Sequence, residues 1–487
     1  MRRFSCPFAV LAAAAAVVFA APAGADAPPP AAQAVTITVQ PGARQTFHGL
    51  GTGQFDGTYH TLPPERRQLL ARLIYRDLHM KSLRLWWSMR EYSPSPGVTH
   101  PEEFAGAYVA SHIIADAKAS GVTTLLLGPF DPPLYMLEDP SHGDSHLKAS
   151  EVKNYAALMA DFIQTLRNKY GVVINVTGIA NEPPWFTPET MAAEVAALRA
   201  ALNARGLAFV GIVAHEAPNN DDVTDDFLRA MKNDPAAWRG LLGIATHSYN
   251  MSARQQEAGI VAGTGKQFWI TEAGGGGPEG PNDGRYAASL AARYFNDMNH
   301  GVTHWMWFLG AVDVGDWPVS ADNSQRLIEF QAGRPADWYL PFLPYYYLRQ
   351  ISDTFDAGCV FRQSRSSEDG DMLWTEAPKP PLVAAAAKNP DGTWGIGLVN
   401  YTSDKFDGWD SGGFHAKGQP ARFFRVTVRV PELAAENTVF DIKRSSESVR
   451  GLDEGHVVMR HGTLTVALAP LEMLTLHSLP KTKKVSR

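Results

Sequence analysis

The sequence predicts an α/β protein: a (β/α)8 TIM barrel with a β-sandwich fused to its side. From residue 47 to about residue 310, short apolar segments alternate with helical patterns, which is typical of repeated βα units. Eight such apolar segments are present, the number that closes a barrel. Beyond residue 343 the segments become short and alternating, with Gly, Asp, Asn and Pro turns between them, which favours an antiparallel sandwich.

The first 25 residues have the features of a secretory signal peptide. An Arg-Arg pair and an apolar stretch from Phe8 to Ala21 are followed by small residues up to Ala25, which predicts cleavage before Asp26. We therefore expect a secreted or periplasmic protein. Residues 26–46 are predicted to be a leader and then a strand that joins the distant sandwich, because "AVTITVQ" alternates between apolar and polar residues.

Bulk properties exclude several classes of protein. No second apolar run of about 18 residues follows the signal, so we expect no membrane span. The formal net charge is -6 without a basic cluster, which argues against a nucleic-acid partner. Cys359 is the only cysteine after the signal, so an intramolecular disulfide is not possible. His100, His142 and His146 are scattered in loops without metal-ligand spacing, so we expect neither a metal nor another cofactor.

The barrel is predicted to span residues 47–343, the sandwich residues 344–480 and a basic tail residues 481–487. The predicted barrel strands are Phe47–Gly51, Ser82–Ser88, Thr123–Phe130, Val172–Ala180, Phe209–His215, Leu241–Tyr249, Gln267–Glu272 and Thr303–Leu309. Four of the predicted helices are Pro63–Arg76, Glu102–Ser120, Glu151–Tyr170 and Pro188–Arg205. In such a barrel the functional residues lie at the C-terminal ends of the strands.

The fourth and seventh strands each end in a glutamate. "GIANEPPWF" carries Asn181 and Glu182, and "FWITEAGGGG" carries Glu272. Glycoside hydrolysis uses such a pair, one carboxyl protonated to assist the leaving group and one ionised to attack the anomeric carbon. We expect the apolar setting of Glu182 to favour its protonated form, and a guanidinium and a phenol to keep Glu272 ionised. Asn181 could donate to a sugar hydroxyl.

Other side chains near the strand ends are assigned with their alternatives. Arg84 is an inward charge on the second strand that needs a partner. His247, in "THSYN", is as easily a buried histidine bonded to backbone as a substrate contact, and we leave it out of the catalytic set. Trp86 and most other tryptophans are expected to pack in the core or loops, whereas Trp185 and Phe186 are predicted walls on the leaving-group side.

Five segments carry a resemblance to a known family: "TVQPGARQTFHGLGTG", "GPFDPPLYM", "GIANEP", "GIATHSYN" and "ITEAG". With them the sequence resembles glycoside hydrolase family 30, in the clan of (β/α)8 retaining glycosidases that place the acid/base and the nucleophile on strands four and seven. The resemblance runs from about Val35 to Leu479. It looks most like the branch that contains glucosylceramidases.

The resemblance implies roles for individual residues. Glu182 would be the acid/base and Glu272 the nucleophile. The residues that would bind substrate or orient the nucleophile are Asn181 at the 2-hydroxyl, Arg84 and Tyr249 at Glu272, Trp307 as the floor of the reacting subsite, Glu91, Phe130 and Trp185. Glu91 stands where glucosylceramidases have an aspartate and Phe130 where they have a tryptophan, so the part of the pocket that reads sugar hydroxyls is altered. Residues 402–425 are longer than expected for that sandwich loop.

These observations predict a secreted retaining β-glycoside hydrolase that cleaves β-linked glycans or glycoconjugates by double displacement through a covalent glycosyl-enzyme. One alternative keeps the fold and the mechanism but has β-xylosidase, β-fucosidase, β-galactosidase or endo-glycanase specificity, for which Glu91 and Phe130 are the discriminating positions. The alternative of another class is a non-catalytic carbohydrate-binding protein. Binding alone would not require two opposed carboxylates.

Overall fold

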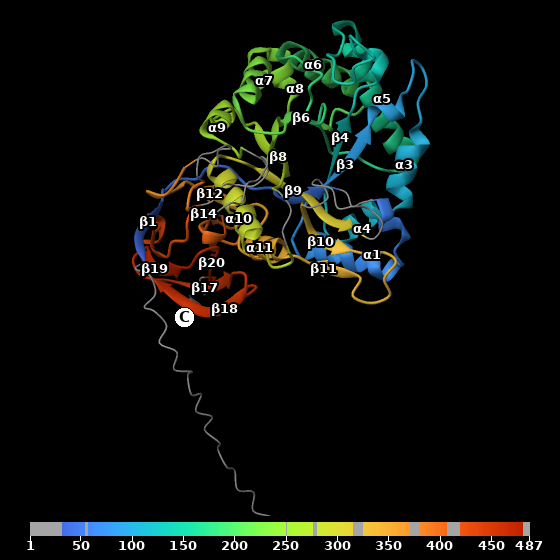
Figure 1. Ribbon diagram of the computed structural model, residues 1–487. Coiled ribbons are helices and arrows are strands. Elements are labelled where there is room, and N and C mark those ends of the chain that lie inside the picture. The colour runs from blue at the N-terminus through green and yellow to red at the C-terminus, as the bar shows by residue number, and fades with distance from the viewer. Residues whose placement is uncertain are drawn as a thin grey trace, which may run out of the picture.

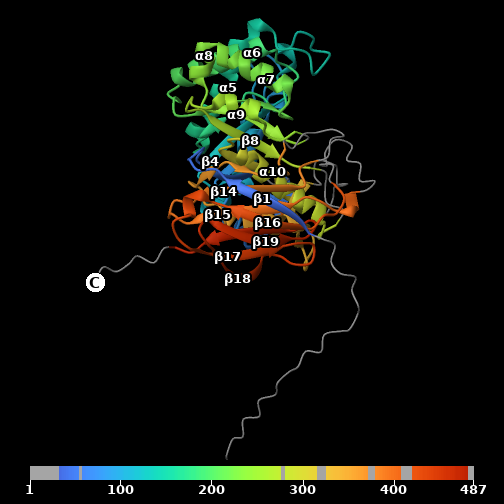
Figure 2. The same ribbon diagram turned by 90° about the vertical axis from the view of Figure 1, so that its left-hand side faces the viewer.

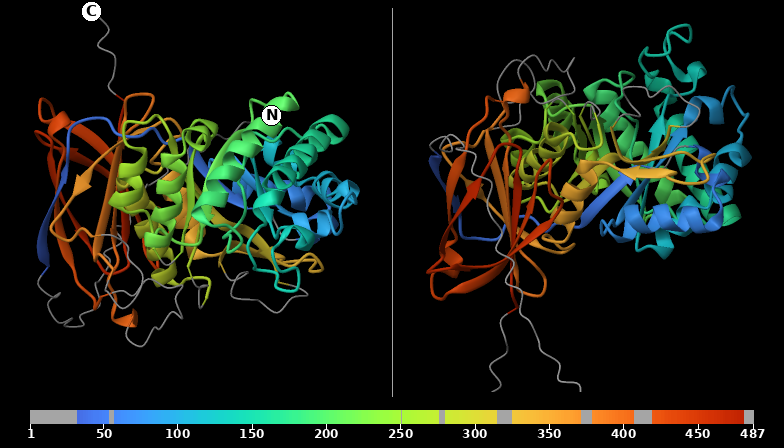
Figure 3. Two further views of the ribbon diagram at one scale, coloured as in Figure 1. Left: turned by 90° about the horizontal axis from the view of Figure 1, so that it is seen from above. Right: turned by 60° about the horizontal axis from the view of Figure 1, so that its bottom comes forward.

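The computed structural model describes residues 32–53, 57–249, 251–275, 280–314, 325–370, 379–406 and 419–480. Within these ranges the chain forms a barrel and a sandwich that lie side by side (Figure 1, Figure 3). The predicted signal peptide, residues 26–31 of the leader, residues 407–418 of the long sandwich loop and the basic tail lie outside the described residues.

Eight parallel strands form the barrel, and the pairing of the last two with each other closes it. In chain order they are β2 (Gly49–Gly53), β3 (Ser82–Ser88), β4 (Thr124–Phe130), β5 (Val176–Thr177), β6 (Gly211–Ala217), β7 (Gly243–Ser248), β8 (Gln267–Ala273) and β9 (His304–Asp313). They follow one another around the barrel in chain order, with β9 returning to β2. The predicted fold class is confirmed.

The fourth strand is much shorter than the predicted Val172–Ala180. Only Val176 and Thr177 pair as a strand. Beyond them the chain touches β4 at two points, where the amides of Gly178 and Asn181 donate to carbonyls of β4. The backbone therefore leaves regular pairing before the predicted acid/base, and Glu182 has a left-handed φ of 43°. Such a conformation is costly for a residue other than glycine and is typical of functional loops.

Helices cover the outside of the barrel. They are α1 (Pro64–Ala71), α2 (Met89–Tyr92), α3 (Pro101–Ala110), α4 (Ile113–Ala119), α5 (Val152–Tyr170), α6 (Pro188–Ala204), α7 (Asp222–Asn233), α8 (Pro235–Gly240), α9 (Gln255–Val261), α10 (Gly284–Asn299) and α11 (Leu343–Ser352). The predicted helix Glu102–Ser120 is two helices, because His112 between them has a left-handed φ of 63°. Two strands outside the closed ring, β10 (Arg326–Phe330) and β11 (Tyr339–Pro341), extend the sheet beside β9.

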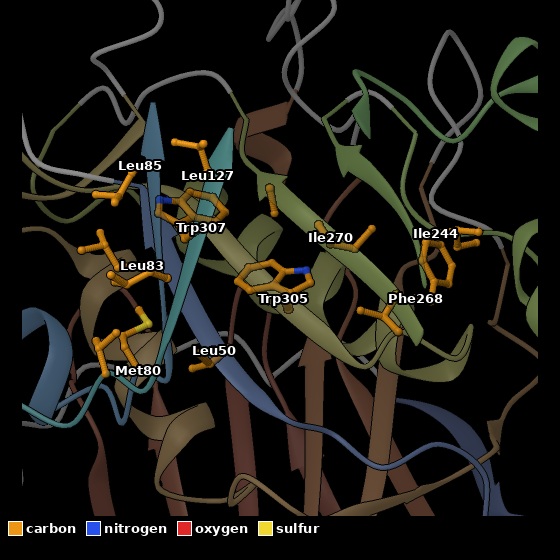
Figure 4. Close-up of a cluster of buried hydrophobic side chains, with 14 of the residues drawn as sticks. Leu50, Met80, Leu83, Leu85, Leu127, Ile244, Phe268, Ile270, Trp305 and Trp307 are labelled. Atoms are coloured by element: carbon orange, nitrogen blue, oxygen red, sulfur yellow. The ribbon is translucent and has the colours of Figure 1, made fainter. Parts of the chain in front are cut away.

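Alternation along the strands divides the barrel core into two layers. The interior is filled by the cluster Leu126, Val176, Val213, Ala245, Trp269 and Met306. Residues one position away face the helices, and Figure 4 shows Trp305 and Trp307 in that outer layer with Leu83, Leu85 and Leu127. This alternation decides which strand residues can reach the mouth of the barrel.

The sandwich consists of a four-stranded and a six-stranded sheet. The first has the order β13 (Ser364–Arg365), β1 (Gln33–Val39), β16 (Phe424–Arg429), β19 (Thr463–Leu468). The second has the order β12 (Val360–Arg362), β14 (Leu382–Lys388), β15 (Trp394–Asn400), β20 (Met473–Ser478), β17 (Thr438–Ser445), β18 (Leu452–Met459). Strand β1 runs parallel to β16, so the start of the described chain lies in the sandwich, as Figure 2 shows. In the described part of the chain, no helix is long and apolar enough to cross a membrane.

Glu194 on α6 carries a buried carboxyl group, and neither of its oxygens has a hydrogen-bond partner among the described residues. Burial raises the pKa of Glu194 well above its ordinary value. Because the folded state then holds a proton that the unfolded state releases, stability falls as the pH rises above the ordinary glutamate pKa of about 4.3. We expect Glu194→Gln to increase the free energy of unfolding near neutral pH by about 1–3 kcal/mol.

Thermal unfolding of the two proteins between about pH 4 and about pH 7 measures this effect. The Tm of Glu194→Gln should exceed that of the wild type increasingly as the pH rises. A Tm difference that is independent of pH would show that Glu194 does not bind the extra proton in the folded state.

Candidate active site

Glu272 ends β8 inside the mouth of the barrel, where two donors hold its carboxylate. Arg84 Nη1 on β3 donates to one oxygen, and the hydroxyl of Tyr249, which follows β7, donates to the other at 2.5 Å. Burial and then the charge of Glu272 raise the pKa of Tyr249 well above its ordinary value, so the phenol keeps its proton. With a donor on each oxygen, the carboxylate has a fixed orientation, which suits a nucleophile.

Glu182 reaches the same mouth from the loop after β5. Its carboxylate accepts a hydrogen bond from His247 Nδ1 at 2.8 Å, and the same nitrogen lies 3.5 Å from Glu272. The side chain of Glu182 is 36% exposed, against 5% for Glu272, so Glu182 is the carboxyl that solvent can reach. Buried His247 therefore stands between the two carboxylates.

The expected protonated Glu182 is not what this environment favours. Burial by itself raises the pKa of Glu182, but the hydrogen bond and the charge of His247 outweigh it and lower that pKa below the ordinary value. In turn, burial lowers the pKa of His247, but Glu272 and Glu182 raise it above its usual range. The prediction rested on the apolar neighbours alone, because His247 had been left out. Each member of the Glu182–His247 pair therefore favours the charged form of the other.

The spacing of the two carboxylates decides which hydrolytic geometry is possible. One carboxylate oxygen of Glu182, one of Glu272 and one ring nitrogen of His247 lie within 4.8 Å of one another. Retaining glycosidases place their carboxyls about 5–5.5 Å apart and inverting ones about 6.5–9.5 Å apart. These three residues could also hold a metal ion, but the Arg84 guanidinium on Glu272 opposes a second cation there.

Asn181 and Glu216 complete the surroundings of Arg84. Nη2 of Arg84 donates to the Asn181 side-chain oxygen at 2.7 Å and to Glu216 at 3.1 Å. Burial alone lowers the pKa of Arg84, but Glu216 and Glu272 raise it, so the guanidinium stays charged. Because the oxygen of Asn181 is occupied by Arg84, its amide nitrogen is the end left to donate to a sugar hydroxyl.

The structure places Trp307 away from the mouth. Its ring is 1% exposed, packs edge-on against Tyr286 of α10, and donates its indole N–H to the carbonyl of Gln325. The reason is the strand alternation: Met306 fills the barrel interior, so its neighbour Trp307 faces the helices. The structure therefore does not bring the Trp307 ring, the predicted floor of the reacting subsite, to the mouth of the barrel.

Three half-buried aromatic rings line the mouth instead, and we call Trp86, Phe130 and Phe308 the aromatic wall. Trp86 lies 5.6 Å from Phe308 and 6.4 Å from Phe130, between ring centroids. The guanidinium of Arg84 lies 5.9 Å from the Phe130 ring, which puts the wall beside the Glu272 cluster. Phe130 was predicted at the site, whereas Trp86 was expected to be packing.

Glu91 and Trp185 are not brought into the carboxylate cluster. Glu91 is exposed on α2, and the side chain makes no hydrogen bond or ion pair with a described residue. Trp185 is 7% exposed, and its indole N–H donates to the Gly143 carbonyl at 2.6 Å. Phe186 is buried against Tyr155. In the structure the predicted leaving-group walls are packing residues, and the hydrogen bond of Trp185 fixes the loop that carries Glu182 onto the loop after β4.

Sequence reasoning missed four residues of the site: His247, Glu216, Trp86 and Phe308. The sequence did carry a signal for Glu216. The segment "VAHEA" places a carboxylate at the C-terminal end of β6, just as carboxylates stand after β5 and at the end of β8. Trp86 stands two positions after the inward-facing Arg84, so strand alternation predicts that it faces inward too. Phe308 and Trp307 could not be separated from sequence alone, because the register of β9 shifts against both neighbouring strands.

Residues 139–320 match the model of glycosyl hydrolase family 59, a range that includes both glutamates. No curated protein sequence matches the chain. A family 30 endoxylanase from Clostridium papyrosolvens C71 aligns with a TM-score of 0.63 and 15% identity over 92% of this chain and 100% of its own.

Two further solved structures give similar values. The catalytic domain of the family 30 xylanase C from Talaromyces cellulolyticus aligns with a TM-score of 0.65 and 14% identity over 91% of this chain and 100% of its own. An endo-β1,6-glucanase aligns with a TM-score of 0.63 and 17% identity over 91% of this chain and 93% of its own. These three structures and the matched family are glycoside hydrolases, and at such identities the structural likeness shows the fold they share with this chain.

Proposed function

We propose that this chain is a retaining β-glycoside hydrolase. The observation that carries the proposal is the pair of glutamates at one barrel mouth, with an oxygen of Glu182 within 4.8 Å of an oxygen of Glu272, a spacing nearer to the about 5–5.5 Å of retaining sites than to the about 6.5–9.5 Å of inverting ones. The match of residues 139–320 to a glycosyl hydrolase family supports it. A non-catalytic binding protein would have no need of two donors on one of two neighbouring carboxylates.

In the proposed reaction Glu272 attacks the anomeric carbon while the leaving oxygen takes a proton from Glu182. The bond to the leaving group breaks, and a glycosyl ester of Glu272 forms. Glu182, now ionised, removes a proton from a water molecule, which displaces Glu272 and releases the sugar with its original configuration. Before the first step, His247 gives Glu182 the proton that the leaving oxygen takes, across their 2.8 Å hydrogen bond.

Substrate and location are further parts of the proposal. We assign the chain to family 30 on the motifs around both glutamates, and the glucosylceramidase-like branch is the finer assignment that these motifs favour. The names of the compared enzymes, an endoxylanase and an endo-β1,6-glucanase, favour endo-acting cleavage of a β-linked polysaccharide as the second candidate. The signal-peptide pattern supports secretion or a periplasmic location.

Proton NMR of the first-formed product tests the proposal. Aryl β-glycosides of glucose, xylose, galactose and fucose should be screened first, followed by glucosylceramide, xylan and β1,6-glucan. Hydrolysis of any of them should yield the β-anomer before mutarotation, because two displacements retain configuration. A first product with the α-configuration would contradict the retaining mechanism, and product length on the polysaccharides would separate exo from endo action.

A further inference from the structure

Glu216 on β6 contacts the machinery of both carboxylates. Its side chain is fully buried and accepts a hydrogen bond from Arg84 Nη2 at 3.1 Å. The other nitrogen of the same guanidinium donates to Glu272. Through its backbone, Glu216 also accepts the amide N–H of Glu182 at 3.0 Å. One residue is thus bonded to the partner of the nucleophile and to the acid/base loop.

The surrounding chain is shaped to admit this ion pair. A Cβ on Gly178 would lie 1.6 Å from Glu216 Oε2, and a Cβ on Gly128 would lie 2.9 Å from the Arg84 guanidinium carbon. Neither position can carry a side chain while the pair stays where it is. Glu216 itself has a left-handed φ of 62°, like Glu182, to which it is bonded. Two such conformations persist only where the surrounding contacts fix them.

We propose that Glu216 is a positioning residue that couples the two catalytic carboxylates. Its carboxylate fixes the plane of the Arg84 guanidinium so that Nη1 points at Glu272, and its carbonyl fixes the backbone that presents Glu182. The inference deepens the proposed function and rests on it. Because a guanidinium has a rigid fork of donors, one held at its Nη2 end cannot rotate away from Glu272 without breaking the contact with Glu216.

Glu194 provides a matched control, since it is an equally buried glutamate without a hydrogen-bond partner in the described part of the chain. We expect Glu216→Gln, which keeps an acceptor oxygen, to lower kcat on the best aryl glycoside, and Glu216→Ala to lower it further, on the order of 10- to 100-fold. KM should stay within about threefold of the wild type, because the loss concerns alignment in the transition state. Glu194→Gln should leave kcat and KM unchanged.

A measurement that does not depend on enzymatic activity, the position of the Arg84 side chain, separates this inference from the proposed function. In a crystal structure of Glu216→Ala, the Arg84 guanidinium should turn away from Glu272, whereas in Glu194→Gln it should keep its contacts. Arg84 still bonded to both Glu272 and Asn181 in Glu216→Ala would overturn the inference even if the chain hydrolysed no glycoside. Wild-type kcat in both Glu216 variants would overturn it too, and an effect confined to KM would do the same.

Discussion

Replacing Glu272 by alanine is expected to lower kcat on aryl β-glycosides by about 10⁴-fold or more. Without the carboxylate no glycosyl ester can form, and the second displacement has nothing to displace. The variant should fold, because the buried Arg84 guanidinium keeps Glu216 as a counterion at 3.1 Å and is not left unpaired. Steady-state kinetics with circular dichroism as a check on folding measures the effect.

Azide distinguishes loss of the nucleophile from a general loss of the site. In Glu272→Ala the removed carboxylate leaves space on the face of the sugar opposite the leaving group, and azide entering there should give the α-glycosyl azide at a rate that rises with azide concentration. Glu194→Gln, with its replacement on α6, should show wild-type kcat and no azide product. Wild-type turnover of Glu272→Ala would remove Glu272 from the mechanism.

Strand alternation explains how far the sequence could predict the site. Arg84 was recognisable as inward-facing because a charge in an apolar strand needs a partner, and the structure gives it Glu272, Asn181 and Glu216. Glu182 and Glu272 follow from the rule that the βα loops of a barrel begin at the C-terminal strand ends. These predictions depend only on strand order and direction, which the eight apolar segments define.

The predictions that failed depended on register and on long-range contacts. Trp307 and Phe308 are adjacent in sequence, and only the shifted register of β9 decides that Phe308 lies beside Tyr249 while Trp307 faces α10. Trp185 is buried against the loop that contains Gly143, whose carbonyl accepts its indole N–H. No local sequence pattern encodes this contact. The pKa of Glu182 was predicted in the wrong direction because it depends on His247, sixty-five residues away in sequence.

His247 also affects what the loss of the acid/base should look like. Replacing Glu182 by alanine is expected to reduce kcat/KM on natural or alkyl β-glycosides by about 10²–10⁴-fold, the usual contribution of general acid catalysis. When the leaving group is a very acidic phenol, it departs as the phenolate without protonation. The first displacement on such an aryl glycoside should therefore be slowed much less. We do not expect His247 to replace the missing acid, because its side chain is fully buried and its Nδ1 lies behind Glu182 at 2.8 Å.

The second displacement gives the sharper result, because it needs Glu182 as a base whatever the leaving group was. With an activated aryl glycoside, Glu182→Ala should form the glycosyl-enzyme quickly and hydrolyse it slowly, so that a burst of phenol precedes a low steady rate. Azide, which needs no base, should restore the steady rate and give the β-glycosyl azide, opposite in configuration to the product of Glu272→Ala. Equal losses on activated and natural substrates, without a burst, would show that Glu182 is not the acid/base and that the proton comes from another group at the mouth.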